Sequence, residues 1–223
     1  MGFDFNYMSE LLPILLKYLG TTMEMATWGL VFSLILAIIL ANIRVFKLPV
    51  LDQLSQLYIS FFRGTPLLVQ LFLLYYGLPQ IFPIMVGIDA FSAAVIGLTL
   101  HFAAYMAESI RAAIIGIDRS QMEASLSVGM TTPQAMRRVI LPQATRVALP
   151  SLMNYFIDMI KSTSLAFTLG VAEIMAKAQM EASSSFRFFE AFLAVALIYW
   201  GVVVILTRVQ IWAEAKLNKA YVR

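Results

Sequence analysis

The chain has 223 residues, of which 61% are hydrophobic and 13% are charged, and its mean hydropathy is +0.82. This composition excludes an ordinary soluble domain of the same length. The chain has no cysteine and only one histidine, so disulfide frameworks and thiolate metal sites are excluded and no metal site is expected.

Five segments are apolar over the roughly 20 residues that a helix needs to cross a bilayer. In chain order they are Thr21–Asn42, Leu54–Leu78, Phe91–Ile115, Val147–Val171 and Phe188–Ile211. No internal repeat or linker divides the sequence. We therefore expect residues 1–223 to form one domain, an all-α integral membrane protein with five transmembrane helices.

The basic residues are distributed unevenly along these segments. Eleven Lys and Arg residues lie at or beyond the carboxyl ends of the first, third and fifth segments, and three lie on the opposite side. Two more, Arg63 and Lys161, lie inside segments. The positive-inside rule therefore predicts an external N-terminus, a cytoplasmic C-terminus and a cytoplasmic loop between the third and fourth segments.

The second segment is interrupted by Arg63-Gly64-Thr65-Pro66. Proline cannot donate a helix hydrogen bond, and its ring clashes with the carbonyl one turn earlier. We expect Thr65 and Pro66 to be the N-cap and first residue of a new half-helix, whose positive end is suited to binding a carboxylate. The alternative is a kink that serves packing alone.

Polar residues recur on one face of the third segment, where His101, Tyr105 and Glu108 stand at i, i+4 and i+7. Ionisable groups inside a membrane usually face a bundle interior or a water-filled cavity, so this row indicates a solute pathway. For Glu108 the favoured interpretation is an ion pair with Arg111, and a single interior histidine is also common as a purely structural residue.

The loop between the third and fourth segments has the composition of two short helices. Gln121–Val128 predicts the first helix, and Gly129 is suited to end it in a left-handed conformation. A second helix is expected to start at Thr132-Pro133, with Thr132 as N-cap, and to end at Leu141-Pro142. Such a compact knob fits a groove in another protein. The alternative is an amphipathic hairpin held by lipid headgroups.

The fourth segment carries a similar polar row formed by Asn154, Asp158, Lys161 and Ser162. Three separate segments thus direct polar groups inward at a comparable depth, which favours a pathway over isolated packing features. The alternative for this row is that Asp158 and Lys161, at i and i+3, only neutralise each other.

The pattern Glu123-Ala124-x-x-x-x-Gly129, followed by Leu141-Pro142, resembles the coupling loop of ABC importer membrane subunits. The resemblance to the polar amino acid branch of type I ABC importer permeases extends from about Leu16 to the C-terminus. It is carried by Phe62–Phe72, Ala104–Ile114, Leu141–Arg146 and Lys161–Leu165. In the loop, Ser125 stands where the family usually has a second Ala, and Val139 where Ile is usual.

The resemblance implies the fold of a type I ABC importer transmembrane domain and a set of partners. These are a cytoplasmic ATP-binding subunit dimer, a second permease subunit that is identical or related, and an extracytoplasmic amino acid-binding protein. ATP and Mg²⁺ would be bound by the ATPase subunit, and this chain would bind no cofactor. Within a coupling loop of about residues 118–145, the residues expected to couple transport to ATP hydrolysis are Glu123, Ala124, Gly129, Leu141 and Pro142.

A third departure concerns the stretch Lys161-Ser162-Thr163-Ser164-Leu165, where the family usually has Lys-Asp-Thr-Ser-Leu. Asp158 stands four residues before Ser162, on the same helix face and about 6 Å away along the axis. The negative charge is thus moved by one turn in this chain. We expect Asp158 to attract a substrate ammonium group. The substrate-binding set is then Thr65, Pro66, His101, Tyr105, Asp158, Ser162 and Ser164.

The leading hypothesis is the permease subunit of an ATP-driven importer for a polar amino acid, with cystine as one candidate, in the cytoplasmic membrane of a bacterium. The chain has no Gly-x-x-x-x-Gly-Lys-Ser/Thr sequence, so ATP hydrolysis is expected in a separate subunit. One alternative is an ion-coupled secondary amino acid transporter that uses Asp158 and Glu108. Another is a structural protein without a pathway, in which the inward polar rows would have no role.

Overall fold

The computed structural model describes residues 2–218, which are helical apart from short connections. The α-helices are α1 (Phe5–Leu16), α2 (Leu19–Val45), α3 (Leu51–Gly64), α4 (Leu67–Phe72), α5 (Leu78–Ile81), α6 (Ala90–Ile115), α7 (Arg119–Ser127), α8 (Thr132–Ala135), α9 (Leu141–Ser162), α10 (Ile174–Ser185) and α11 (Phe188–Asn218). Two π-helical turns, Leu73–Gly77 and Met136–Ile140, and two 3-10 segments, Pro83–Met85 and Thr163–Leu169, join some of them.

The prediction of five membrane spans agrees with this arrangement. Helices α2, α6 and α11 are each long and apolar enough to cross a bilayer. Two bent helical pairs pass the same test: Leu51–Gly64 with Leu67–Ile81, bent by 111°, and Thr132–Leu169 with Ile174–Ser185, bent by 54°. Counting each bent pair as one span gives five, so the second and fourth spans are broken.

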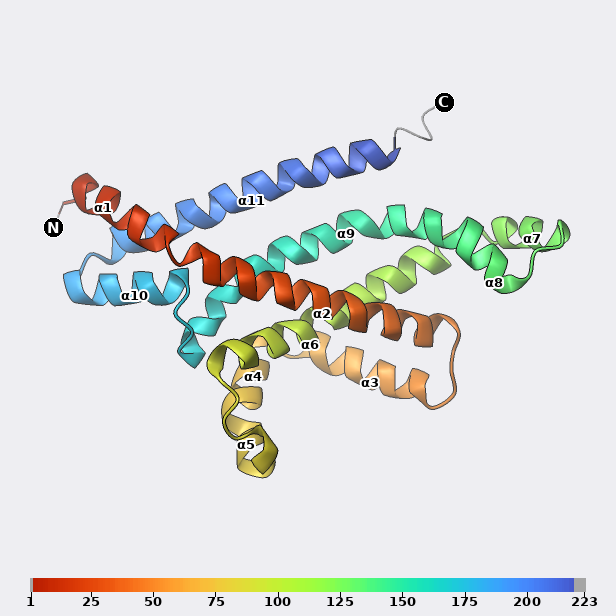
Figure 1. Ribbon diagram of the computed structural model, residues 1–223, viewed down its shortest axis with the longest axis horizontal. Helices are drawn as coiled ribbons and strands as arrows, with labels where there is room; N and C mark the ends of the chain where they lie inside the picture. The colour runs from red at the N-terminus through yellow and green to blue at the C-terminus, as the bar shows by residue number, and fades with distance from the viewer. Residues whose placement is uncertain (1, 219–223) are drawn as a thin grey trace.

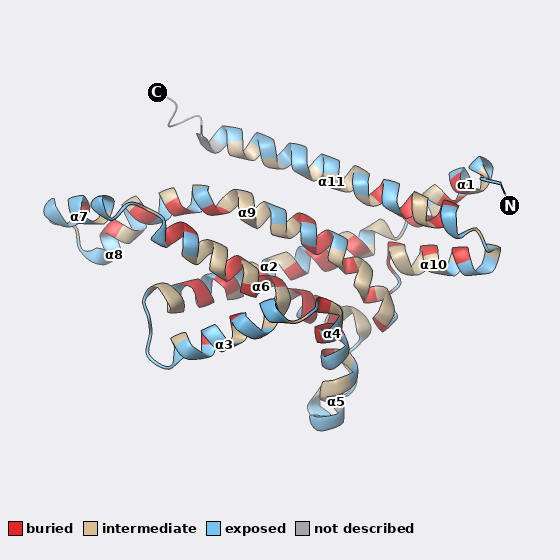
Figure 2. Cartoon of the chain, turned by 180° about the vertical axis from the view of Figure 1, so that it is seen from behind, coloured by how far each residue is buried: buried red, intermediate tan, exposed pale blue. Residues whose placement is uncertain are grey.

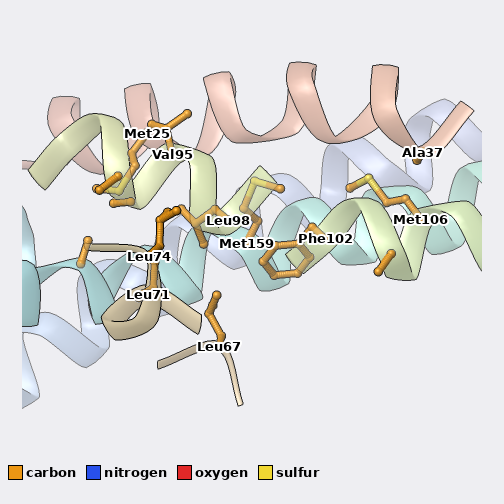
Figure 3. Packing of buried hydrophobic residues seen from close by; sticks show 14 of the residues in the cluster. Met25, Ala37, Leu67, Leu71, Leu74, Val95, Leu98, Phe102, Met106 and Met159 are labelled. Carbon is orange, nitrogen blue, oxygen red and sulfur yellow. The ribbon is translucent and has the colours of Figure 1, made fainter. Parts of the chain in front are cut away.

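The core lies between α2, α6 and α9. Met25 of α2, Leu98 of α6 and Met159 of α9 are 0%, 1% and 0% exposed and meet in one cluster (Figure 3). Gly29 allows the close approach of α2, because a Cβ atom there would lie 2.8 Å from the Met159 sulfur. Figure 2 shows burial on the inward faces of these helices, whereas much of α11 is exposed.

A second, smaller cluster joins α1, α10 and α11. Leu11, Leu15 and Ile174 are almost fully buried in it. The five predicted segments leave residues 172–187 as a connection between the fourth and the fifth. Most of this connection forms α10, because the Glu173 carboxylate accepts a hydrogen bond from the Ala176 amide at 2.7 Å and the alanine-rich helix packs on its neighbours.

The connections predicted to be cytoplasmic lie together, and so do two of the predicted external segments. Figure 1 shows the α2–α3 connection, α7 and α8, and the carboxyl end of α11 at one end of the bundle, and α1 and α10 at the other. This is the grouping that the distribution of Lys and Arg predicts. Two of the counted residues, Lys219 and Arg223, lie outside the described residues.

The assignment of these two ends to the two membrane faces is testable in the Cys-free background. Cys at the exposed positions Ile84 and Ser184 is expected to react with an impermeant thiol reagent in intact cells. Cys at Thr132, beside the capping residue of α8, is expected to react only after permeabilisation. Gly87 is unsuitable because its φ of +97° would strain any side chain. Labelling of Thr132→Cys in intact cells would contradict this orientation and place the knob outside.

Candidate functional site

The second span breaks at Pro66, as its sequence predicts, but the capping differs from the expectation. Thr65 ends α3 in an extended conformation, Pro66 is the N-cap of α4, and the helix starts at Leu67. Thr65 was therefore wrongly predicted as the N-cap. Its hydroxyl donates instead to the Phe61 carbonyl at 2.8 Å. That carbonyl has lost its regular partner because the Thr65 backbone is extended.

Gln70 closes the break, and the sequence analysis did not identify it. Its side-chain amide donates to the Phe62 carbonyl at 3.0 Å, to the Thr65 carbonyl at 3.1 Å and to the Thr65 hydroxyl at 2.8 Å. The helix partner of the Phe62 carbonyl would be the amide of Pro66, which proline lacks. Gln70, only 5% exposed, replaces that donor. A single polar residue four positions after the proline was the available signal.

Gln70 also orients His101 on α6. The Gln70 amide nitrogen is used by three acceptors, so its oxygen faces His101 Nδ1 at 2.9 Å. Nδ1 is therefore the donor in this contact, and Nε2 is the ring nitrogen that is left for other partners. The His101 ring lies 5.1 Å from the ring of Tyr105, one turn further along. The break in the second span is thus tied to the polar row of α6.

Tyr105 extends this row to α3 and α9. The Arg63 guanidinium lies 5.4 Å from the centre of the Tyr105 ring, and the Tyr105 hydroxyl donates to the Arg63 carbonyl at 3.4 Å. On the other side, the ring of Tyr155 on α9 lies 5.9 Å away. The Ser109 hydroxyl donates to that of Tyr155 at 3.3 Å. The three predicted spans therefore bring their polar groups together, through Tyr155 and not through Asp158.

Asp158 lies on an exposed face of α9 and contacts Lys161, with 2.6 Å between its carboxylate and the Lys161 ammonium. Both side chains are about half exposed in this chain, at 52% and 53%. The hydroxyls of Ser162 and Ser164 donate to the backbone carbonyls of Asp158 and Lys161 in their own helical run. The contact between Asp158 and Lys161 is the one that the pairing hypothesis requires. Substrate binding by the same groups stays a prediction.

Four charged residues form a cluster where α2 and α6 end and α3 begins. Arg111 donates to Glu108 at 2.7 Å, as the sequence predicts for this pair. Arg44 lies 3.8 Å from Glu108 and 3.3 Å from Asp52. The cluster links the start of α3 to the end of α6, directly before the loop, and supports a structural role for Glu108.

The loop forms the predicted knob. Asp118 caps α7, and the donation of the Ser120 amide to its carboxylate at 2.8 Å lowers the pKa of Asp118. Gly129 turns the chain with φ of +83°, as expected. The N-cap of α8 is Thr131, whose amide donates to the Gln134 side chain at 2.9 Å, and not Thr132 as predicted.

The second helix of the knob does not end at Leu141-Pro142, and that expectation was wrong. Pro142 stands at the start of α9, directly after the π-helical turn Met136–Ile140. Proline has no backbone N–H to donate, and the wider turn lets the helix continue past it. The helical path therefore continues from Thr132 to Leu169. Ile140 is buried in a cluster with the end of α6, whereas Leu141 is 38% exposed and Pro142 is also exposed.

The outer face of the knob is free in the described chain. Glu123 and Ala124 are exposed, and Leu126 and Val128 are 45% and 75% exposed. Ser125, which stands where the family usually has Ala, is buried, and its hydroxyl donates to the Gln121 carbonyl at 2.7 Å. The substitution thus leaves the knob intact.

Residues 13–219 match the family model of the binding-protein-dependent transport system inner membrane component. This chain belongs to that family of permeases. It is 98% identical, over the full length of both chains, to the probable amino-acid ABC transporter permease protein PatM of Vibrio harveyi. It is 38% identical to the L-cystine transport system permease protein TcyL of Bacillus subtilis, over all of this chain and 95% of the relative.

A solved structure shares the fold of this permease closely. The crystal structure of an amino acid ABC transporter with histidines superposes with a TM-score of 0.90 at 34% identity, covering 97% of this chain and 100% of that one. The chain is therefore an amino-acid ABC transporter permease, a multi-pass membrane protein with a type I ABC importer fold. Its family implies an ATP-binding subunit and a partner permease.

In this permease, substitutions separate the two hypotheses for Asp158. If the carboxylate binds a substrate ammonium, Asp158→Asn is expected to lower uptake severalfold. Asp158→Ala combined with Ser162→Asp should then recover part of it, because the charge moves by one turn. Uptake is measured per amount of permease in the membrane. Rescue of Asp158→Asn by Lys161→Met, with unchanged substrate preference, would leave only the pairing role.

Proposed function

We propose that this permease forms one half of the translocation pathway of an ATP-driven importer for polar amino acids. A cytoplasmic ATPase dimer binds ATP and Mg²⁺ and hydrolyses ATP, and this chain itself binds no cofactor. A second permease subunit completes the pathway, and an extracytoplasmic binding protein delivers the substrate. The importer works in the cytoplasmic membrane of a bacterium, with the N-terminus of the permease outside and its C-terminus inside.

The observation that carries the proposal is the continuous helical path from the knob to the interior of the bundle. Helix α8, the π-helical turn and α9 run without interruption from the exposed tip near Thr132 to the face that carries Asp158 and Ser162. A displacement of the knob by the ATPase is thereby transmitted along a helix that lines the proposed pathway. Because α-helices are stiff along their axis, the two ends move together.

The docking surface in this proposal is the exposed face formed by Glu123, Ala124, Leu126 and Val128, turned outward by Gly129. Beside it, a hollow of about 540 Å³ is lined by Pro133, Gln134, Arg137 and Arg138. Apolar side chains with an adjacent basic hollow suit a groove in a soluble partner that has acidic residues at its rim. Leu141 and Pro142, the first residues of α9, join the knob to the spanning helix in this proposal.

The polar pathway and the relatives support a proposal for the substrate class. The TcyL relative is named for L-cystine and the solved structure contains histidines, at similar identities of 38% and 34%. These amino acids differ in their side chains and share an α-ammonium and an α-carboxylate. We therefore propose that the pathway recognises this common part, with Asp158 nearest the ammonium and Thr65, Pro66, His101, Tyr105, Ser162 and Ser164 around it.

Affinity purification tests the partnership. Tagged permease is expected to co-purify with an ATP-binding subunit, and replacement of residues 119–131 by a Gly-Ser segment of equal length is expected to abolish this. Membrane insertion of the altered chain is checked by its yield in the membrane fraction. Undiminished uptake by the altered chain would favour an ion-coupled transporter instead.

A further inference from the structure

Arg63 differs from the other basic residues of α2, α3 and α6. Arg44 and Arg111 have carboxylate partners within 4.0 Å, and Lys161 on α9 pairs with Asp158. Among the residues and side chains that the structure describes, the Arg63 guanidinium has no ion pair and no hydrogen bond, and it lies over the Tyr105 ring. Glu108, at the far end of the polar row of α6, already contacts the guanidinium groups of Arg44 and Arg111.

The position of Arg63 makes an absent partner costly. It stands in the last turn of α3, twelve residues after Leu51 at the start of that helix. At 1.5 Å per residue this is about 18 Å from the end of the span, and the hydrocarbon core is about 30 Å thick. Arg63 therefore lies near mid-membrane, too deep for a lipid phosphate at either surface. A charge at this depth needs an anion or water.

The surroundings hold the guanidinium in a fixed place without neutralising it. It lies 5.4 Å from the ring centre of Tyr105, which leaves its N–H groups available. The Tyr105 hydroxyl donates to the Arg63 carbonyl, so backbone and side chain are fixed to the same ring. Arg63 itself is exposed in this chain and borders the 111° break of the second span.

We infer that Arg63 binds the α-carboxylate of the transported amino acid. A planar guanidinium presents two parallel N–H groups to a carboxylate, and such bidentate contacts are strong at a site shielded from water. The inference deepens the proposed function by naming the group that receives the acid. It assigns to Arg63 the role that we expected of the helix start after Pro66, where α4 begins at Leu67.

The geometry also gives the substrate an orientation. Arg63 contacts Tyr105, and Tyr105 contacts Tyr155 on α9, one turn before Asp158. A carboxylate held at Arg63 therefore lies beside the Tyr105 ring, and the rest of the amino acid extends along the aromatic row toward Tyr155 on α9. The side chain of the amino acid is left outside the contact with Arg63, so amino acids with different side chains can share it.

The test compares acids with their amides in the complete transporter, with ATPase subunits, reconstituted in nanodiscs. Stimulation of ATP hydrolysis is measured without the binding protein for two probe pairs, L-histidine with L-histidinamide and L-cystine with its diamide. In the unaltered transporter the acid is expected to act at a concentration about 10- to 100-fold below its amide. Arg63→Gln is expected to weaken the acid alone and bring this ratio close to one, with Arg63→Lys between them.

Arg208→Gln is the matched control, because Arg208 is also exposed on a spanning helix and lies far from the break. It is expected to keep the full ratio. If Arg63→Gln lowers activity with an unchanged ratio of acid to amide, the guanidinium instead pairs with an acid of the second permease and the inference is wrong. If neither probe acid stimulates the unaltered transporter and no amino acid is taken up with ATP, this result contradicts the proposed function itself and not only the role of Arg63.

Discussion

Gly129→Val is expected to abolish amino-acid-stimulated ATP hydrolysis while the permease stays folded in the membrane. Gly129 has φ of +83°, and a β-branched residue in that conformation is strained by about 1–3 kcal/mol. No atom beyond the two adjacent residues lies within 4 Å of a Cβ placed there, so the strain is confined to the turn. The turn relieves it by moving α7 away from α8, which separates the two halves of the docking surface.

Glu123→Arg tests the same surface without altering the backbone. Glu123 is exposed on α7, and a reversed charge there is expected to weaken docking beside the basic residues of the knob. Gly201→Val is the control for Gly129→Val, because Gly201 lies within the helix α11 and also has open space around it. ATP hydrolysis with and without amino acid is measured on purified complexes. Full stimulation in both knob variants would remove the coupling role from this loop.

Gln70→Leu is expected to have the second large effect, on both stability and transport. The substitution keeps the size of the side chain and leaves the carbonyls of Phe62 and Thr65 without their donor. An unsatisfied buried carbonyl costs about 1–3 kcal/mol, so the break is expected to become the weakest part of the bundle. His101 also loses its partner, and its ring is no longer held toward Tyr105.

The readouts for Gln70→Leu are the thermal midpoint of the purified permease and the rate of uptake. Gln56→Leu serves as the control, because Gln56 is exposed on α3 and makes a single side-chain hydrogen bond, to Asp52. We expect a clear fall of the midpoint for Gln70→Leu and almost none for Gln56→Leu. Equal midpoints for the two variants would mean that the break does not depend on Gln70.

The sequence was most informative where local chemistry decides the structure. Pro66 has no amide to donate, so a break in the second span followed from its identity alone. Gly129 predicted the turn of the knob because glycine adopts the left-handed conformation that ends a helix. The clustering of Lys and Arg predicted which connections share an end of the bundle, because that pattern reflects membrane insertion and does not depend on packing.

Features that depend on distant contacts were missed. Helix α10 was read as a connection, because its stability comes from Ile174, Ala178 and Ala182 packing against α1 and α11. Gln70 was not identified, because its importance lies in carbonyls that become unpaired only after the chain bends. The continuation of the helix past Leu141-Pro142 depends on a π-helical turn, which single-residue preferences do not predict.

The central claim is that ATP hydrolysis by a partner, transmitted through the knob at residues 118–145, drives amino acid uptake through this permease. The most direct measurement is uptake of labelled L-histidine and L-cystine by proteoliposomes that contain the permease, its ATPase subunits and its binding protein. ATP is supplied on the side of the membrane where the ATPase subunits lie, and no ion gradient is imposed. We expect uptake of at least one of them that requires ATP and is lost in Gly129→Val. Uptake that proceeds without ATP and follows an imposed ion gradient would contradict the account.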